Sequence, residues 1–366
     1  MEYVQERVTT LHQLRDSNPP APTDRAAVVV PMTEREYAGL AAKRVLSELE
    51  AVDPKRVVIP LRASPEKVGP FRDWLAGYDL PLEVLWCSGP QVGELLADNG
   101  LNGHGGKGRD VWLALGQVLD AEYIVCHDAD TKTYDRRYVS RLLFPLAHGH
   151  AFSKGYYARV ENGQLYGRLF RLFYAPLVRT LIDEADADIL RYLDAFRYAL
   201  AGEFAATSEL VAQMRVQRSW GLEIGTLGEA YTHAGVTGSA QVDLGAYEHD
   251  HRAVSGPTGL SEMSAAVGEA LFRVVEEHGV EPDYSTLAER YQSAATDFVR
   301  QYEADATFNG LSYDWSAECD QIEQYANGLA VPGEDSRLPA WNEAPITPAA
   351  VAEAAAADLR AATVDR

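Results

Sequence analysis

Cysteine and long apolar runs are both scarce in this chain. Its 366 residues include three cysteines, Cys87, Cys126 and Cys319, which are too scattered for a disulfide framework and form no CxxC pair for structural zinc. No stretch of about 18 uninterrupted apolar residues occurs, so no membrane span is expected. The amino-terminal MEYVQERVTTLHQL carries acids and has no long apolar core, so no signal peptide is visible. We therefore expect a cytoplasmic protein without a membrane partner.

Lysine is also scarce, and the charge balance is strongly acidic. The chain has six lysines, 33 Lys plus Arg against 54 Asp plus Glu, and a net charge of −21. Such a chain repels nucleic acid and anionic lipid, so no nucleic-acid partner is expected. We infer adaptation to high salt, because screening relieves the self-repulsion of an acidic surface. The thermal unfolding midpoint should fall sharply when molar salt is removed, and indifference to salt would contradict this hypothesis.

The composition and patterning of the first half predict an α/β fold. Hydrophobic residues make up 46% of the chain, as a packed core requires. Short β-branched runs alternate with helical patterns, which is typical of βαβ units and a parallel sheet. The expected strands are 26–32, 56–61, 82–86 and 122–127, and the expected helices are 36–50, 66–77 and 109–119. Ligands bind such sheets beyond the carboxyl ends of the strands.

The rest of the chain divides into a mixed part, a helical part and an arm. Strands are expected at 151–160 and 239–245, with helical pieces from 165 to 214 and a helix within 219–235. From Leu260 onward the pattern is helical. Residues 331–348 are rich in Pro and turn formers, which predicts a linker or a wrapping arm. An alanine-rich helix is expected after the arm, either marginally stable or docked on the rest of the protein. The predicted division is a catalytic region 1–255, a helical extension 256–330, and an arm with its terminal helix, 331–366.

Two acids end an apolar run in YIVCHDADTKTYD. Asp128 and Asp130 directly follow the strand, where two carboxylates can face Mg²⁺ or Mn²⁺ and a diphosphate. An Asp-rich turn is the alternative, and the pattern leaves both interpretations open. His127 is expected only to pack at the strand end. A second DAD, residues 186–188, lies among other acids in a helical pattern and predicts a solvated face.

Two histidines in GAYEHDHR form a second candidate site. His249 and His251 are spaced i, i+2, so on an extended strand they point the same way and can bind zinc. No HExxH motif or nearby cysteine supports zinc. A single histidine joining Asp130 around a divalent ion is equally compatible with the pattern, and a surface loop is the ordinary alternative.

Further polar residues stand at turns and helix starts. Glu203 in LAGEFAAT and Glu223 in SWGLEIG can hydrogen-bond substrate hydroxyls, with an exposed helical Glu as the alternative for each. Lys107 in NGHGGKGRD stands near a helix N-terminus, which favours a phosphate, and the glycines allow close backbone approach. Gly167 and Arg168 in LYGRLFR can hold an anion, although an Arg on a helix is usually a surface residue.

The order of these pieces is more specific than any one of them. Between Val28 and His251 the chain carries, in order, VVVPMTERE, GGKGRDVWLAL, YIVCHDAD, SKGYYAR, YGRLFRL, LAGEFAAT, WGLEIGTLGEAY and AQVDLGAYEHDH. In these it resembles the retaining glycosyltransferases of the glucosyl-3-phosphoglycerate synthase type, with the related mannosyl-3-phosphoglycerate synthases. The resemblance implies a GT-A domain, which is a Rossmann-like nucleotide-diphospho-sugar transferase fold, followed by a C-terminal helical extension.

The resemblance also implies a donor site and a metal site. In the resemblance, Pro31, Glu34 and Ser64 contact the nucleoside, and Lys107 supports the nucleotide. Asp128 lies against the ribose and sugar side of the donor. The donor sugar is contacted by the backbone of Leu200 and Gly202 and by the carboxylate of Glu223. Mg²⁺ or Mn²⁺ would be held by Asp130 and His249 together with the diphosphate. Glu223, Asp130 and Lys107 are the implied catalytic residues, because charge develops on the leaving diphosphate.

The implied acceptor site contains the departures from the family pattern. It falls on Gly167, Arg168 and His251. The family has a small hydroxyl residue where this chain has Phe170, Arg where it has Tyr247, and Asn where it has His251. The loop LRASPE also lacks the family's Asp, which bears on the donor base.

These departures leave several identities open. UDP-glucose is the first expectation for the donor and GDP-mannose the second, and the expected acceptor is a small hydroxy acid such as 3-phosphoglycerate, giving a compatible-solute precursor. A glycosyltransferase with a lipid or glycan acceptor and a non-catalytic nucleotide-sugar sensor are the alternatives. A homodimer is compatible with the sequence.

Overall fold

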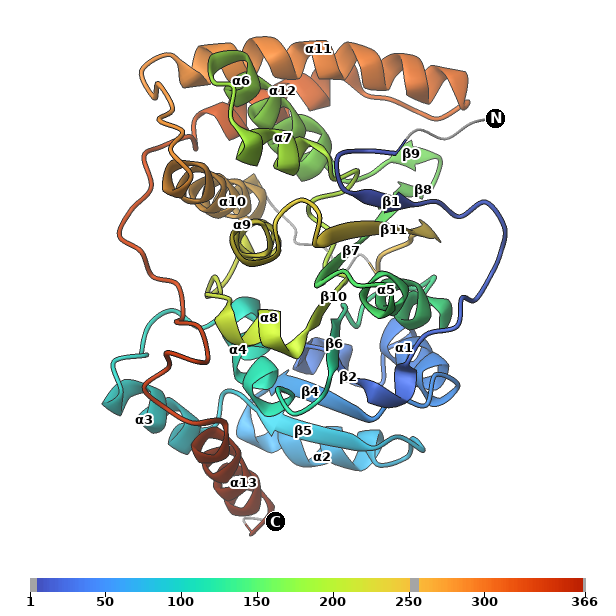
Figure 1. The fold of residues 1–366 in the computed structure, drawn as a ribbon, viewed down its shortest axis with the longest axis vertical. Coiled ribbons are helices and arrows are strands. Elements are labelled where there is room, and N and C mark those ends of the chain that lie inside the picture. The colour runs from blue at the N-terminus through green and yellow to red at the C-terminus, as the bar shows by residue number, and fades with distance from the viewer. Residues whose placement is uncertain (1–4, 251–256, 365–366) are drawn as a thin grey trace.

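The computed structural model describes residues 5–250 and 257–364, and nine strands of this described part form one sheet (Figure 1). Within this sheet every strand pair is parallel except the two made by β10, so the predicted parallel sheet is confirmed as the main architecture. β10 is a correction, because only helical pieces were predicted between 165 and 214. Along the sheet the order is β1 (Thr9–Leu11), β11 (Ser239–Ala246), β7 (Phe152–Ala158), β10 (Phe204–Thr207), β6 (Tyr123–Cys126), β2 (Ala26–Val29), β4 (Arg56–Arg62) and β3 (Met32–Thr33), with β5 (Leu82–Trp86) beside β4; β8 (Val160–Glu161) and β9 (Gln164–Leu165) pair separately.

Helices cover both faces of the sheet. They are α1 (Leu40–Glu50), α2 (Pro65–Leu75), α3 (Pro90–Asp98), α4 (Lys107–Gln117), α5 (Arg137–Ala147), α6 (Ala175–Glu184), α7 (Asp188–Asp194), α8 (Ser208–Gln213) and α9 (Leu222–Ala234). One hydrophobic cluster joins α4 and α9 to one face, and a second joins α1, α2 and α5 to the other. α3, α5 and β1 were not predicted. The four residues of β2 and of β6 are all buried, as expected for strands covered on both faces.

The predicted helical extension packs against the sheet domain. It consists of α10 (Pro257–Glu277), α11 (Leu287–Phe308) and α12 (Trp315–Ala326), which contact α6, α9 and a π-helical turn, η3 (Leu169–Tyr174). Leu271, Tyr291 and Val299 are buried there, so α10 and α11 each turn an apolar face toward the core. The start of α9 is fitted closely to α10: Gly221 has φ +85°, and an added Cβ would lie 2.7 Å from the Cβ of Ala270. This contact fixes where α9 begins.

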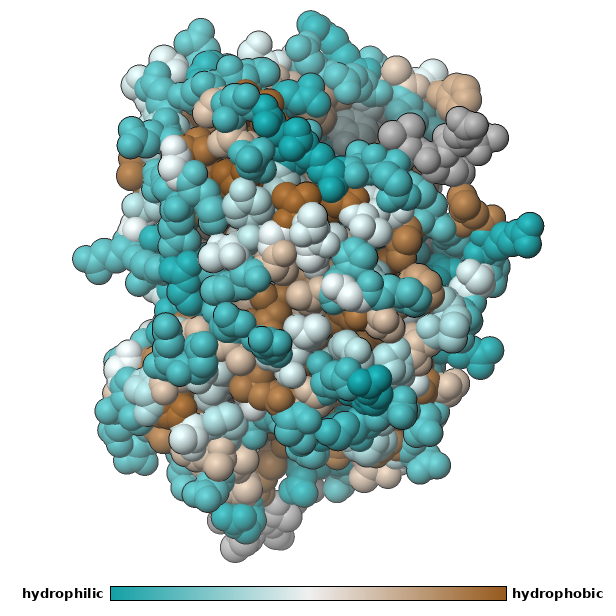
Figure 2. All heavy atoms as spheres, in the orientation of Figure 1, coloured by the Kyte–Doolittle hydropathy of each residue, from teal (hydrophilic) through white to brown (hydrophobic). Residues whose placement is uncertain are grey.

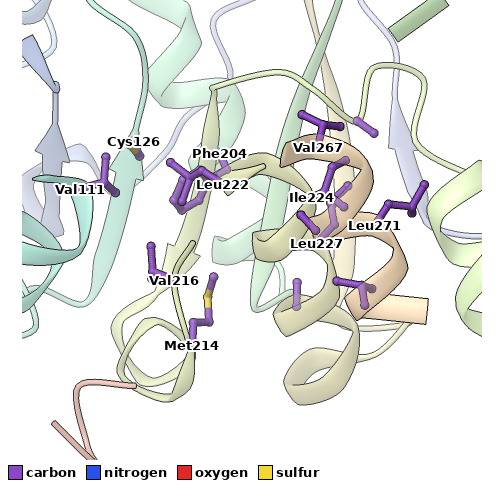
Figure 3. Packing of buried hydrophobic residues seen from close by; sticks show 14 of the residues in the cluster. Val111, Cys126, Phe204, Met214, Val216, Leu222, Ile224, Leu227, Val267 and Leu271 are labelled. Carbon is purple, nitrogen blue, oxygen red and sulfur yellow. The ribbon is translucent and has the colours of Figure 1, made fainter. Parts of the chain in front are cut away.

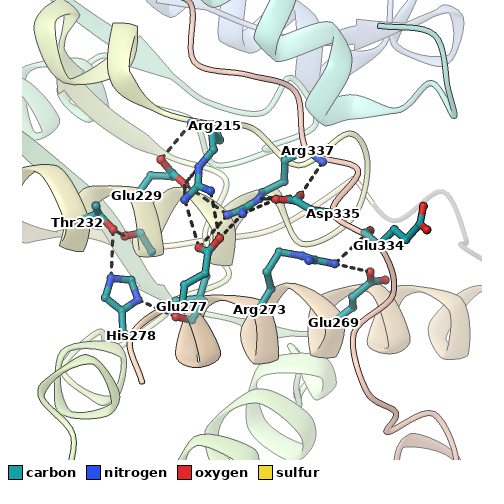
Figure 4. A network of polar contacts seen from close by, with 12 residues as sticks. Arg215, Glu229, Thr232, Glu269, Arg273, Glu277, His278, Glu334, Asp335 and Arg337 are labelled. Atoms are coloured by element: carbon teal, nitrogen blue, oxygen red, sulfur yellow. Dashed lines mark hydrogen bonds and ion pairs between the residues drawn. The ribbon is translucent and has the colours of Figure 1, made fainter. Parts of the chain in front are cut away.

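The segment after α12 is a wrapping arm. Leu338 pairs with Val216 through both backbone hydrogen bonds, and Trp341 stacks on Trp112 with ring centroids 4.2 Å apart. Arg337 joins Glu229 of α9 and Glu277 of α10 in a network of ion pairs (Figure 4). The arm therefore ties α4, α9 and α10 together.

The final helix, α13 (Pro348–Val364), docks rather than standing free. It packs against α2, α3, α4 and β5, with Val351 and Ala355 buried. The buried carboxylate of Asp358 accepts hydrogen bonds from the backbone N–H groups of Gln91 and Val92, at 3.0 and 3.1 Å. Asp358 thus satisfies two free donors in the first turn of α3 and stabilises it.

The surface is consistent with the acidic composition. Figure 2 shows a largely hydrophilic face on which apolar residues are scattered. Within the described residues, no helix combines the length and the apolar character needed to cross a bilayer.

Candidate active site

The predicted acidic loop lies at the carboxyl end of β6. β6 ends at Cys126, and Asp128 and Asp130 follow it with side chains that are partly exposed. His127 points inward instead: its Nε2 lies 2.9 Å from the hydroxyl of Tyr134, and burial lowers the pKa of its imidazole to about 4. His127 therefore packs as a neutral residue at the strand end, as predicted.

Lys107 brings two distant carboxylates together. Its Nζ lies 2.7 Å from Oδ1 of Asp128 and 3.3 Å from Oε1 of Glu223, so the starts of α4 and α9 meet at the end of β6. Burial lowers the pKa of Lys107, but the charges of Asp128 and Glu223 outweigh it and raise that pKa well above the usual value. Lys107 therefore carries a positive charge near the start of α4, which suits it to bind an anion.

The glycines around Lys107 serve packing between two segments of the chain. A Cβ on Gly108 would overlap the carbonyl oxygen of Gln217, and one on Gly106 would lie 2.7 Å from Oγ of Ser219. The backbone N–H of Arg109 donates to the carbonyl of Arg218 at 2.9 Å. Close backbone approach to a phosphate was the predicted reason for these glycines. The structure adds a second reason, because the glycines let α4 lie against the segment that leads into α9.

Replacing Gly108 with alanine should destabilise the protein by about 2 kcal/mol, because the added methyl group overlaps rigid backbone. Urea unfolding measures this. Gly93→Ala is the matched control: Gly93 is exposed on α3 with open space at its Cβ, so alanine there should stabilise by up to about 1 kcal/mol. Equal unfolding midpoints for the two variants would contradict the packing role of Gly108.

Asp130 and His249 already touch. Nε2 of His249 lies 2.9 Å from Oδ2 of Asp130, and the backbone N–H of Asp250 donates to the carbonyl of Asp130 at 2.7 Å. Burial lowers the pKa of His249, but the hydrogen bond to Asp130 outweighs it, so the pKa is raised. The segment 130–132 and the segment 248–250 are thus paired backbone to backbone, although they are far apart in sequence.

This pair fits a divalent cation. Oδ1 of Asp130 is buried and has no hydrogen-bond partner among the described residues, and an unused carboxylate oxygen beside an imidazole is suited to a metal. No third His, Cys, Asp or Glu completes a cation site within the part of the chain that the structure describes. Ligands from a bound diphosphate would therefore complete the coordination. The alternative pairing of His249 with His251 falls outside the described residues, as does the predicted acceptor role of His251.

The remaining predicted donor residues lie around the same edge. Oγ of Ser64 donates to Oε2 of Glu34 at 3.0 Å, and Pro31 lies in the short link between β2 and β3 that precedes Glu34. Gly202 is backed by Asp128, whose Oδ2 would lie 2.5 Å from an added Cβ. Leu200, two residues earlier, packs against both hydrophobic clusters. The structure therefore brings the predicted donor residues to one edge, and their individual roles stay predictions.

The predicted acceptor residues lie at the start of η3. Gly167 has φ +78°, and a Cβ added to it would lie 3.0 Å from the hydroxyl oxygen of Tyr198. Nε of Arg168 donates to Oε1 of Glu318 at 2.8 Å, and 41% of the Arg168 side chain is exposed. Arg168 is therefore partly held by α12 and partly free for a ligand.

The departures Phe170 and Tyr247 belong to one aromatic cluster. Tyr247 is buried, stacks on Tyr157 at 3.8 Å and receives a hydrogen bond from Thr131. The ring of Phe170 lies 4.9 Å from that of Tyr198. Tyr247 thus supports the loop that carries Asp130 rather than presenting a charge to a ligand.

Two charged side chains of this region are buried, and only one of them, Glu203, was a predicted candidate. Glu203 is 0% exposed and precedes β10, so the alternative of an exposed helical glutamate was wrong. Burial raises the pKa of Glu203 to about 7. Lys154 on β7 is also buried, although sequence analysis gave it no role. The available signal was a single charged residue between apolar and small neighbours, in LAGEFAA and AFSKGYY.

The second DAD lies apart from this site. The side chains of Asp186 and Asp188 are 76% and 70% exposed and pair with Arg191 near the start of α7. The predicted solvated position is confirmed, although Asp186 lies in the loop before the helix.

Comparison with known proteins identifies the family. The chain is 34% identical to a glucosyl-3-phosphoglycerate synthase of Methanococcoides burtonii over 384 residues, covering 94% of both chains. It is 36% identical to one of Persephonella marina over 321 residues, covering 82% of this chain and 79% of the relative. This chain belongs to the glucosyl-3-phosphoglycerate synthase family. As a glucosyl-3-phosphoglycerate synthase family member it is a glycosyltransferase, and the resemblance seen in its motifs is confirmed.

Solved structures support the GT-A fold of this glucosyl-3-phosphoglycerate synthase family member. A mannosyl-3-phosphoglycerate synthase from Rubrobacter xylanophilus matches with a TM-score of 0.57 and 23% identity, covering 74% of this chain and 82% of that one. A glucosyl-3-phosphoglycerate synthase from Mycobacterium tuberculosis, in complex with Mn²⁺, UDP and phosphoglyceric acid, matches with a TM-score of 0.54 and 20% identity, covering 75% and 88%. No family model matches the chain.

Proposed function

We propose that this glycosyltransferase moves glucose from UDP-glucose to 3-phosphoglycerate with retention of anomeric configuration. The observation that carries the proposal is the meeting of Lys107, Asp128 and Glu223 beside the Asp130–His249 pair, at the carboxyl edge of the sheet. The names of the two relatives support glucose and 3-phosphoglycerate, and a related structure contains UDP-glucose, Mn²⁺ and phosphoglyceric acid.

In this proposal the donor lies across the ends of β2, β4 and β6. Glu34 and Ser64 hold the nucleoside, and Asp128 holds the ribose and sugar side. Lys107 turns from its two carboxylates toward the diphosphate, where its charge stabilises the leaving group. Glu223, in the first turn of α9, accepts hydrogen bonds from sugar hydroxyls and fixes the anomeric carbon.

The bond changes follow from this placement. Asp130 and His249 would hold a divalent cation, Mg²⁺ or Mn²⁺, which would add positive charge near the diphosphate. The bond between the anomeric carbon and the phosphate oxygen breaks, with its electron pair leaving on UDP. The free hydroxyl oxygen of the acceptor bonds to the same face of the carbon, and its proton goes to a diphosphate oxygen. Retention follows because attack and departure share one face.

The acceptor binds beside Gly167 and Arg168. Gly167 has a positive φ at the turn that leads into η3, and the exposed part of the Arg168 side chain can bind the acceptor phosphate. Tyr247 stands where the family has an arginine and brings no positive charge. In this proposal Arg168 therefore contributes a larger share of the binding of the acceptor phosphate.

Product analysis tests the proposal. The protein is incubated in high salt with Mg²⁺, with UDP-glucose or GDP-mannose, and with 3-phosphoglycerate. We expect glucosyl-3-phosphoglycerate by mass spectrometry and an α-linkage by NMR, because UDP-glucose is an α-glycoside. Product only from GDP-mannose would replace the donor. Binding of UDP-glucose without turnover would favour the sensor, and turnover only with a lipid or glycan would favour that acceptor class. A homodimer and action in the cytoplasm remain predictions.

A further inference from the structure

Lys154 differs from the other lysines of this chain. All six lie within the described residues; four are exposed, and Lys107 is partly exposed at the site. Lys154 alone is fully enclosed, at 1% exposure, and its Nζ has no hydrogen-bond partner in the described structure. A buried ammonium without a partner lowers stability, because it gives up its hydration without compensation. Burial alone therefore does not explain why a lysine stands here.

The position of Lys154 in the sheet directs it toward α9. Lys154 is directly opposite Phe204 in the antiparallel pair of β7 and β10, and Phe204 is opposite Cys126 on β6. Residues directly opposite each other point to the same face of a sheet. Phe204 and Cys126 belong to one hydrophobic cluster with Leu222, the first residue of α9 (Figure 3). Lys154 therefore lies beneath the first turn of α9, which contains Glu223.

The charges around Lys154 come from several elements. Glu223 on α9 and Glu203 before β10 favour its charged form, whereas Lys107 on α4 disfavours it. Glu203 is opposite Gly155 and so points to the other face of the sheet. On β11 the neighbour is Gln241, whose side chain is occupied by Thr10, Ala195 and Arg197. Glu223 is therefore the carboxylate that shares the face of Lys154.

We propose that Lys154 is a positioning residue that holds the Glu223 carboxylate from below while Lys107 engages the donor diphosphate. This inference rests on the proposed function for the roles of Glu223 and Lys107. Nζ of Lys107 lies within 3.3 Å of a carboxylate oxygen of both Asp128 and Glu223. One ammonium group cannot pair closely with both carboxylates and with a diphosphate at the same time. When Lys107 turns toward the diphosphate, Glu223 loses its cation. Lys154 is enclosed and cannot follow, so it keeps Glu223 in place under the sugar.

Lys154→Met tests the proposal, since methionine is similar in length and neutral. We expect kcat/KM for the donor to fall by about tenfold or more, while Tm is unchanged or higher, because a buried charge has been removed. Lys43→Met is the matched control: Lys43 is exposed on α1, and its loss should leave both quantities unchanged. Wild-type kcat/KM in Lys154→Met would overturn the proposal. A lower Tm together with lost activity would also overturn it, because Lys154 would then be structural.

The pH dependence gives a readout that does not need substrate. Burial lowers the pKa of Lys154 from 10.5 to about 8, so between these values the unfolded chain binds more protons than the folded one. Wild-type stability therefore rises with pH in that window relative to Lys154→Met. We therefore expect the Tm of the variant minus that of the wild type to fall from about pH 8 to about pH 10. Cys126 does not titrate there, because burial raises its pKa to about 12. A constant Tm difference would contradict the placement of Lys154.

A double-mutant cycle separates this inference from the proposed function. Glu223→Gln, Lys154→Met and the double variant are unfolded thermally without ligand. If the two side chains are coupled, Glu223→Gln lowers Tm more in the wild-type background than in the Lys154→Met background. Additive changes would overturn the coupling even if the enzyme forms its product. Coupling without any product from UDP-glucose would instead reject the proposed function and leave the pairing in place.

Discussion

Replacing Asp130 with asparagine should lower kcat/KM by about 1,000-fold, or about 4 kcal/mol of transition-state stabilisation. Asparagine keeps the size of the side chain but removes the charge that faces His249 at 2.9 Å. The buried Oδ1 of Asp130, which has no partner within the described residues, would no longer belong to a carboxylate. Initial rates with saturating Mg²⁺ measure the loss. Calorimetric titration of UDP should show that the variant has lost the metal-dependent part of its affinity.

The chain offers a control with the same local sequence. Asp188→Asn changes the last residue of the other DAD, which is exposed and pairs with Arg191 at the start of α7. We expect unchanged kinetics and a loss of a few tenths of a kcal/mol in stability, because an acid at a helix N-terminus is mildly favourable. If Asp130→Asn retained activity and metal-dependent binding of UDP, the assignment of the metal site would be wrong.

Replacing Glu223 with glutamine should lower kcat/KM by about 100-fold, or about 2.7 kcal/mol. Glutamine is a weaker acceptor for sugar hydroxyls than a carboxylate. It also leaves Asp128 as the one anionic partner of Lys107 among the described residues. We expect most of the loss in kcat, because fixing the anomeric carbon matters most in the transition state. Steady-state kinetics with varied UDP-glucose separates kcat from KM.

Glu209→Gln is the control for this substitution. Glu209 is also a glutamate in the first turn of a helix, α8, but it is exposed and lies away from Lys107. Its loss should leave kcat and KM unchanged. A change in KM alone for Glu223→Gln would mean that Glu223 binds the donor and the transition state equally well. The proposed role of Glu223 in fixing the anomeric carbon would then be wrong.

Local sequence was sufficient where burial follows from a short pattern. The apolar run before Asp128 predicted a buried strand, and β6 is indeed buried at all four residues. The acids that follow the strand therefore lie at the edge of the sheet. The two DAD triplets were separated by context alone, one after a buried strand and one among surface acids. Helix α5 and strand β10 were missed, since Pro145 interrupts the pattern of the first and the second has four residues among helical segments.

The acidic loop, the βαβ order and the family followed from the sequence by itself, because each is written in contiguous residues. The tertiary structure decided which charges meet. Lys107 and Glu223 are 116 positions apart and touch because Gly108 lets α4 lie against the segment before α9. His249 reaches Asp130 through pairing of two distant loops. Glu203 and Lys154 become special only by burial, and burial depends on every element packed around a residue rather than on its neighbours in the chain.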